Sequence, residues 1–233
     1  PFDINDCVLD FQKVSEDSKE KSNVDILLAA VKKDHVLQKI KAVEEAGLTV
    51  KAVDVDILAI TNAFLRNFPA QDSTKTFALL DVGASCTDVS ILKGGVPAFF
   101  RQISVGSNEC NAAIAKRMGV SPEEAETLKV SPGEKAQEVA DCTKTVLNGL
   151  IDEIKLSFGY YENQSGGGID EVYLGGGGAA IPGLDMAFQE TLGSKPHYWD
   201  PFGFLDATQI PGGLSLDEKA KNTFGVAVGL ALR

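Results

Sequence analysis

The sequence has few basic residues, few cysteines and no long apolar segment. Its 233 residues hold 22 Lys and Arg against 33 Asp and Glu, a formal net charge of −11 at pH 7. Nucleic acids and anionic lipids attract basic surfaces, so this charge argues against a nucleic-acid binder and against nonspecific membrane docking. The longest clean apolar run, Phe224 to Leu232, is far shorter than the ~20 residues of a membrane-spanning helix.

The four cysteines form no CxxC pair, and no histidine stands close enough to complete a zinc set. This pattern predicts free, buried thiols in a reduced cytoplasmic protein. The four are Cys7, Cys86, Cys110 and Cys142.

Apolar patterning predicts an α/β chain that begins with a small α+β unit. The second strand of this unit is a near-continuous apolar run, which is typical of a strand buried on both faces. The predicted elements are a strand at Cys7–Val14, a charged connection at Ser15–Asn23, a strand at Val24–Val31, a helix at Lys32–Ala46, a strand at Leu48–Val55 and a helix at Ile57–Phe68.

A second module begins at Thr76 with an antiparallel meander, because its strands are separated by short Gly turns. A capping box at Ser121–Glu124 starts one of the helices that follow. The predicted strands are Phe77–Val82, Thr87–Leu92, Val96–Arg101 and Glu171–Leu174, and the predicted helices are Ser107–Met118, one from Ser121, Gly133–Asn163, Pro182–Leu192 and Leu216–Leu232.

The first glycine-rich turn lies between two predicted strands, from Asp81 to Asp88. A Gly at a strand end lets backbone amides converge on an anion, and the small residues that follow allow a phosphate to approach. Asp81 would then act through a Mg²⁺ held largely by water. The alternative is a plain hairpin turn. The expected phosphate-binding residues are Gly83, Ala84, Ser85, Cys86 and Thr87.

The second turn is a run of glycines after a strand, comprising Gly175, Gly176, Gly177 and Gly178. Successive glycines cost backbone entropy, so a flat or charged ligand is expected against this backbone. A flexible linker is disfavoured because a helix opens directly afterwards. A dinucleotide fingerprint is a further alternative, with Asp200 as its acid, but too few residues follow Asp200 for that fold.

Together, the two turns and the long helix between them resemble the second half of the actin-like ATPase (ribonuclease H-like) fold. The resemblance implies that the first turn holds the β- and γ-phosphates of ATP with Mg²⁺ and that the second lies under the adenosine. The segment Ala125–Lys129 resembles the AExxK segment of that fold, so Glu126 and Lys129 would approach the ribose and base. The alternative is a weak surface pair on an exposed helix face.

The match narrows to the type IV pilus assembly protein PilM family, which is related to the cell-division protein FtsA. It covers nearly the whole chain and implies four parts: 1–55 as a small inserted α+β subdomain, 56–75 as the crossing helix of the first actin-like half, 76–215 as the second half, and 216–233 as a C-terminal helix returning to the first half. The segments that carry it are Pro1–Asp3, Asp10–Gln12, Ile26–Ala30, Glu45–Leu48, Val53–Asp56, Leu80–Ser85, Phe100–Gly106 and Leu174–Ala179.

The resemblance implies a cytoplasmic ATP-binding scaffold at the inner face of the inner membrane. Its partners would be the cytoplasmic N-terminal tail of PilN and other inner-membrane pilus assembly components, and it would reach the membrane only through them. Asp56 would position water on the γ-phosphate beside Asp81, or act only as a helix N-terminal acid. The family's first acid-Gly phosphate turn is missing here, so either the natural protein is longer or this version cannot hold ATP in the usual way, and the start at Pro1 favours the first explanation. Alternatives are a small-molecule kinase and a nucleotide-independent interaction module.

Overall fold

The computed structural model describes residues 3–13, 26–68, 74–206, 216 and 218–233. The chain divides into two compact units, Pro1–Val55 with Arg233 and Asp56–Leu232. The connection expected at Ser15–Asn23 lies outside the described residues. Within the described ranges, no helix has both the length and the apolar character needed to cross a bilayer.

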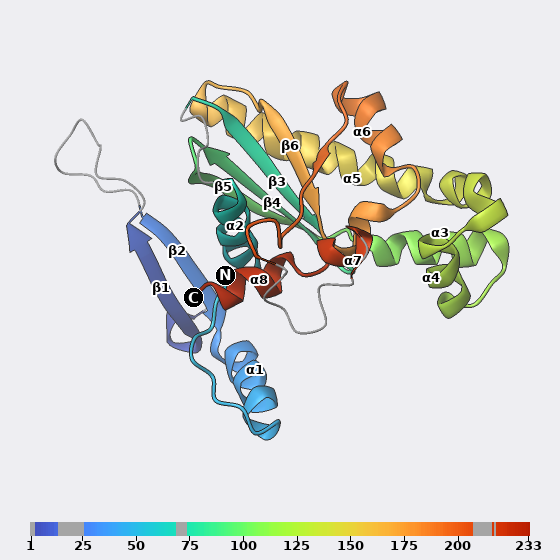
Figure 1. Ribbon diagram of the computed structural model, residues 1–233. Coiled ribbons are helices and arrows are strands. Elements are labelled where there is room, and N and C mark those ends of the chain that lie inside the picture. The colour runs from blue at the N-terminus through green and yellow to red at the C-terminus, as the bar shows by residue number, and fades with distance from the viewer. Residues whose placement is uncertain (1–2, 14–25, 69–73, 207–215, 217) are drawn as a thin grey trace. The chain divides into compact units, whose positions relative to one another are not determined.

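The smaller unit is a two-stranded antiparallel sheet with one helix (Figure 1). The expectation that its second strand is buried on both faces is wrong, because Leu28 is 58% and Ile26 54% exposed. An apolar run indicates burial only when other elements cover both faces of the strand. Phe11, the cross-strand partner of Leu28, is exposed as well. The elements are η1 (Ile4–Asp6), β1 (Cys7–Lys13), β2 (Ile26–Lys32) and α1 (Lys33–Glu45).

Residues 48–55 form no strand, contrary to the expectation from their apolar pattern. A strand needs a neighbour for its backbone hydrogen bonds, and the described sheet of this unit contains only β1 and β2. Leu48 and Val53 are accordingly exposed. Asp54, in the same segment, forms an ion pair of 2.6 Å with Arg233.

The larger unit contains a five-stranded sheet with the strand order β5-β4-β3-β6-β7. The predicted antiparallel meander is confirmed as β3, β4 and β5, and β6 joins β3 in parallel. The strands are β3 (Thr76–Val82), β4 (Thr87–Lys93), β5 (Val96–Ile103), β6 (Glu171–Gly175) and β7 (His197–Tyr198).

The helices of the larger unit agree with the sequence except at the C-terminal end, where the single helix expected over Leu216–Leu232 is wrong. α7 ends at Asn222, and the carbonyl oxygen of Asn222 accepts a hydrogen bond from the Gly176 amide at 3.1 Å. The chain therefore turns before α8 starts. The helices are α2 (Asp56–Asn67), α3 (Ser107–Met118), α4 (Pro122–Val130), η2 (Gly133–Lys135), α5 (Ala136–Ser165), η3 (Gly177–Ala180), α6 (Leu184–Leu192), α7 (Glu218–Asn222) and α8 (Gly225–Ala231).

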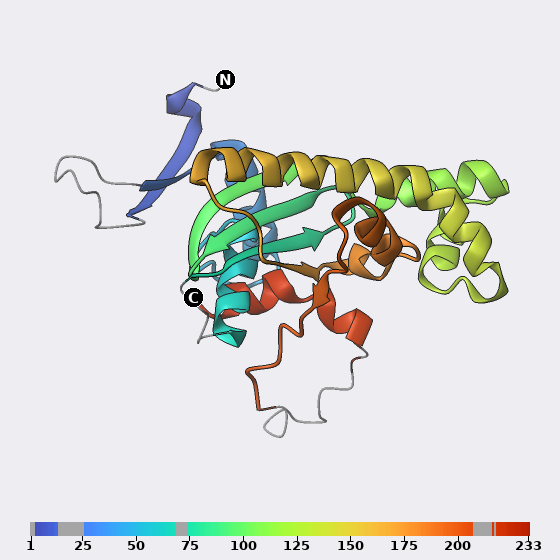
Figure 2. The same cartoon turned by 90° about the horizontal axis from the view of Figure 1, so that it is seen from above.

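The sheet of the larger unit lies between two helical layers, with α5 and α6 on one face and α2 and α8 on the other (Figures 1 and 2). Side chains alternate along β3 because a strand has a period of two. Leu80 and Val82 pack in the core with α5, whereas Leu79 packs in the core with α2. The same alternation places Asp81 on the α2 face.

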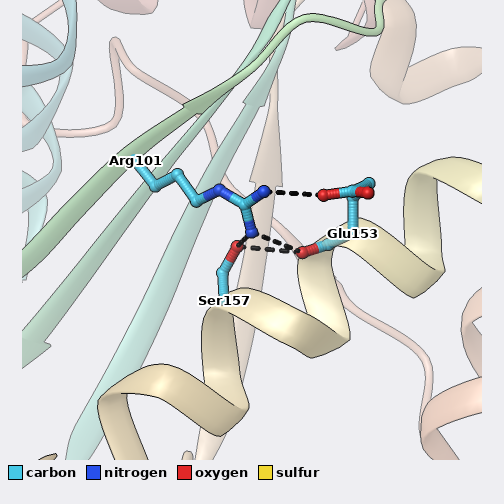
Figure 3. A network of polar contacts seen from close by, with 3 residues as sticks. All are labelled: Arg101, Glu153 and Ser157. Carbon is cyan, nitrogen blue, oxygen red and sulfur yellow. Dashed lines mark hydrogen bonds and ion pairs between the residues drawn. The ribbon is translucent and has the colours of Figure 1, made fainter.

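Arg101 on β5 fixes this strand to α5 (Figure 3). Its guanidinium contacts the Glu153 carboxylate at 2.6 Å, the Glu153 carbonyl oxygen at 3.3 Å and the Ser157 hydroxyl at 3.0 Å. The next residue, Gln102, faces the other way and donates to Asp88 at 3.0 Å. β5 therefore contributes to both faces of the sheet.

Candidate functional site

The two glycine turns lie side by side at the carboxyl ends of neighbouring parallel strands. Asp81 on β3 is in register with Gly175 on β6, so the turns that follow these residues leave the same edge of the sheet. A Cβ built on Gly176 would stand 2.3 Å from the Asp81 Oδ1 atom and 2.4 Å from the Val82 carbonyl oxygen. Gly176 also has φ of +86°, a conformation that favours glycine. No other residue type could let the second turn approach the first so closely.

Three carboxylates gather on the α2 side of the first turn. Asp81 and Asp88 are direct cross-strand partners, so their side chains lie on one face of the sheet, and Asp56 begins α2 on that face. Burial, together with the negative charges of Asp88 and Asp56, raises the pKa of Asp81 to about 6. Burial also raises the pKa of Asp88, against the opposing hydrogen bond from Gln102. A cation near Asp81 would relieve this repulsion.

In the first turn, the carbonyl oxygens are hydrogen-bonded to the start of α3, whereas two of the amides are exposed. The Ser107 and Asn108 amides, at the start of α3, donate to the carbonyl oxygens of Gly83 and Ala84 at 2.9 Å each. The amides of Ala84 and Ser85, by contrast, have no hydrogen-bond partner in the part of the chain that the structure describes, and both residues are exposed. Exposed backbone amides of this kind are suited to bind an anion.

Two other predicted residues of this turn are less accessible. The Thr87 side chain is buried, and its hydroxyl donates to the Val105 carbonyl oxygen at 2.8 Å, so Thr87 supports the turn from inside. Cys86 is half-buried, and burial together with Asp88 and Asp81 raises the pKa of its thiol. The thiol therefore stays protonated at neutral pH. All four cysteines are free, as predicted, although only Cys110 and Cys142 are fully buried.

The second turn opens onto a cavity of about 670 Å³. Gly177 is exposed, whereas Gly175, Gly176 and Gly178 are buried, and the cavity is lined by the residues that follow the glycines rather than by the glycines themselves. The Trp199 indole packs directly against Gly175, where a Cβ would approach its Nε1 atom to 3.0 Å. Sequence reasoning missed this cavity and most of its residues. It is lined by Ala179, Ala180, Ile181, Pro182, Gly183, Asp185, Tyr198, Trp199, Asp200 and Asn222.

Glu126 and Lys129 form a pair on α4 with an N–O distance of 2.7 Å. One end of the pair is buried and the other is at the surface, since the Lys129 side chain is 5% exposed and the Glu126 side chain 49%. Lys129 also donates to the Ser107 carbonyl oxygen at 3.4 Å, and Asn111 donates to Glu126 at 2.5 Å. Burial raises the pKa of Glu126, but the hydrogen bonds from Lys129 and Asn111 outweigh burial, so the pKa is lowered overall. Because Ser107 also supports Gly83, this pair is joined to the first turn.

The dinucleotide alternative finds no support in this geometry. Its acid, Asp200, forms an ion pair with Lys221 at 2.9 Å, and a 3-10 turn rather than an α-helix follows the glycines. Among the described residues, no three His, Cys, Asp or Glu side chains are arranged to hold a metal ion directly. A Mg²⁺ held mainly by water and phosphate oxygens, with one carboxylate nearby, fits the acids that are present.

Comparison with known proteins decides the family. The family model described as "Type IV pilus assembly protein PilM" matches residues 1–233. The chain belongs to this PilM family. A solved structure, the PilM-PilN type IV pilus biogenesis complex, shares 26% sequence identity at a TM-score of 0.86, with 100% of this chain and 68% of that chain covered.

Two more distant likenesses concern the fold of this PilM family chain. MreB 5 of Spiroplasma citri bound to AMPPNP is similar at a TM-score of 0.59 and 14% identity, over 87% of this chain and 64% of that one. The ethanolamine utilization protein EutJ of Salmonella typhimurium is 26% identical over 157 residues, 65% of this chain and 48% of EutJ. The chain thus spans about half the length of the curated relatives it matches. The predicted actin-like ATPase fold is confirmed.

Proposed function

We propose that this PilM family chain binds ATP with Mg²⁺ at its paired glycine turns and serves as a scaffold for the cytoplasmic tail of PilN. The contact between Gly176 and Asp81 is the observation that carries the nucleotide part. It brings the first turn and the cavity to one edge of a single sheet. ATP would need both, because its phosphates are charged and its nucleoside is flat.

The charges of the first turn favour a metal-bound phosphate over a free one. Asp81, Asp88 and Asp56 would repel a bare triphosphate, and the exposed amides of Ala84 and Ser85 cannot offset three acids alone. With Mg²⁺ between them, Asp81 would hold a water of the metal while the amides bind phosphate oxygens. Asp56, exposed at the start of α2, is the second acid available to orient an attacking water.

The cavity beside the second turn fits the nucleoside end. Its volume of about 670 Å³ falls within the range of small-molecule sites, roughly 300–1,000 Å³. Ala179 and Ala180, which follow the exposed Gly177, line the cavity, and Lys129 with Glu126 would approach the ribose from α4. A related fold, MreB 5, binds AMPPNP in its solved structure, which supports the same use here.

Titration of the full-length protein with ATP tests this assignment. We expect binding in Mg²⁺ and a loss of binding when EDTA replaces Mg²⁺, whereas a site for a bare anion would bind equally in both. Absence of binding in Mg²⁺ would refute the nucleotide part and favour an interaction module that works without nucleotide.

The PilN partner is supported by the PilM-PilN complex, which matches the whole of this chain. The chain would then act in the cytoplasm and reach the inner membrane through PilN. Calorimetry with a synthetic peptide of the PilN cytoplasmic tail tests this, with a scrambled peptide of the same composition as the control. If both peptides fail to bind with and without Mg-ATP, the partner assignment is wrong.

A further inference from the structure

One wall of the cavity beside the second glycine turn contains a hydrogen-bonded tyrosine, Tyr198. The Tyr198 hydroxyl lies 2.6 Å from the Asp185 Oδ1 atom and 3.2 Å from the Ala179 carbonyl oxygen. All three residues line the cavity. The hydroxyl has one proton, which it donates across the shorter, charge-assisted contact to Asp185, and the Ala179 carbonyl oxygen is the alternative acceptor.

This one hydroxyl bonds its own strand to α6 and lies within hydrogen-bond distance of a third element. Tyr198 belongs to β7, Asp185 to the first turn of α6, and Ala179 to η3, which continues the second glycine turn. β7 has only two residues, paired with β6 through Tyr173–His197 and Leu174–Tyr198. So short an edge strand has few backbone bonds to fix it, and the hydroxyl supplies a further attachment at the cavity.

The hydroxyl keeps its proton under ordinary conditions. Burial raises the pKa of Tyr198, and the hydrogen bond to the negatively charged Asp185 raises it further. Tyr198 therefore remains a donor across the physiological range, and its bonds do not change with pH in the way that a histidine contact would.

We infer that Tyr198 is a positioning residue for the nucleoside end of the ligand. By donating to Asp185, it holds β7 to α6 and so fixes the wall of the cavity that these two residues form, without contacting the phosphates. The inference rests on the proposed nucleotide binding. It predicts that Tyr198 matters for ligands with a nucleoside and not for ligands that occupy the first turn alone.

The experiment measures binding of three probes to the full-length protein: Mg-ATP, adenosine and Mg-tripolyphosphate. Tyr198→Phe keeps the ring and removes only the hydroxyl. We expect it to weaken Mg-ATP and adenosine binding by up to about tenfold, the value of one lost hydrogen bond, and to leave tripolyphosphate unchanged. Tyr160→Phe, on α5 and outside the cavity, is the matched control and should change none of the three.

A second variant tests whether the loss in Tyr198→Phe comes from its hydrogen bond to Asp185 rather than from a general loss of structure. Asp185→Asn keeps an acceptor but removes its charge, so it should weaken adenosine binding less than Tyr198→Phe. The double variant should be no worse than Tyr198→Phe alone, because both changes break the same contact.

Different results would contradict the role of Tyr198 and the proposed nucleotide binding. Equal losses for tripolyphosphate and adenosine in Tyr198→Phe, or no loss for either, would overturn the positioning role while nucleotide binding stands. Failure of the unmodified protein to bind any of the three probes would overturn the proposed function, and the role of Tyr198 with it.

Discussion

The two glycine turns differ in almost every respect except their position. The first, from Asp81 to Asp88, is charged, narrow and stabilised by the backbone of α3. The second, from Gly175, is uncharged and opens onto a cavity with Trp199 and Tyr198 in its wall. The difference shows how one sheet edge can bind a ligand with two unlike ends. The acids of the first turn lie on β3, β4 and α2, whereas the cavity beside the second turn presents aromatic rings along with the acids Asp185 and Asp200.

The largest effect is expected where the two turns meet. Gly176→Ala would place a Cβ 2.3 Å from Asp81 and would strain a backbone with φ of +86°. We expect a loss of at least about 3 kcal/mol of unfolding free energy, measured by urea denaturation. Gly193→Ala is the control for backbone strain alone, since Gly193 has φ of +77° and no atom within 4 Å of its Cβ position. It should cost only about 1 kcal/mol. Equal costs would mean that the turns are not in tight contact.

A change to Asp81 should affect the first turn and leave the second turn unaffected. Asp81→Asn should weaken Mg-ATP binding by about 10- to 100-fold, as loss of an outer ligand of a metal does, and leave adenosine binding intact. The same variant should raise the stability of the ligand-free protein by about 1–3 kcal/mol at pH 8, because a charge that burial disfavours is removed.

The sign of the pH dependence follows from the raised pKa. The folded carboxyl of Asp81 holds its proton to about 6, against an ordinary value of 3.8, so the folded state binds more protons between these values. The stability gap between Asp81→Asn and the unmodified protein should therefore be small at acid pH, grow through that window and level off above it. Asp152→Asn, an exposed acid on α5, should show no such gap. A constant gap at all pH values would contradict the assigned burial.

Lys129 tests whether the two turns act separately. It contacts the first turn through Ser107, but the resemblance gives it a role beside the nucleoside at the second turn. The PilM resemblance places it near the base, whereas the structure connects it through Ser107 to Gly83. Lys129→Met should weaken adenosine binding several-fold if the first placement is right, and tripolyphosphate binding if its effect passes through Ser107. Binding of both probes decides this, with Lys155→Met on the exposed face of α5 as the control.

The same variant has a readout that is independent of any ligand. Lys129 and Asn111 lower the pKa of Glu126 by hydrogen bonding, so Lys129→Met should raise it, as NMR titration of the Glu126 carboxyl would show. The stability that this pair gives is present above the ordinary pKa of Glu126 and is lost as the pH falls through its lowered value. An unchanged pKa would mean that the pair is not formed in solution.

The glycine turns and the meander could be predicted from the sequence because their signals are local. An acid and a glycine at a strand end, such as Asp81 and Gly83, determine the conformation of the residues next to them. The same holds for four glycines before a helix. Even the pairing of Asp81 with Asp88 was within reach, since a tight hairpin places residues that flank its turn opposite each other. The sequence reading included Asp88 in the motif but gave it no role.

Features that depend on distant neighbours could not be predicted in the same way. The apolar run of β2 indicated burial, but exposure depends on which elements cover a strand, and Leu28 is exposed. The bond between Tyr198 and Asp185 joins residues 13 apart in no recurring motif. It exists because β7 pairs beside β6, which only the assembled sheet decides. The break after Asn222 likewise depends on Gly176, far away in sequence.

The smallest effect is expected from Arg101, which stabilises the sheet behind both turns without reaching either. Arg101→Gln would remove its contacts with Glu153 and Ser157 and cost about 1–2 kcal/mol of stability, since the site is partly exposed. Lys93→Gln at the exposed end of β4 should cost almost nothing. Binding of adenosine and tripolyphosphate should be unchanged in both variants. Loss of tripolyphosphate binding alone in Arg101→Gln would mean that β5, through Gln102 and Asp88, sets the charge of the first turn, and that the two turns differ in their support as well as in their chemistry.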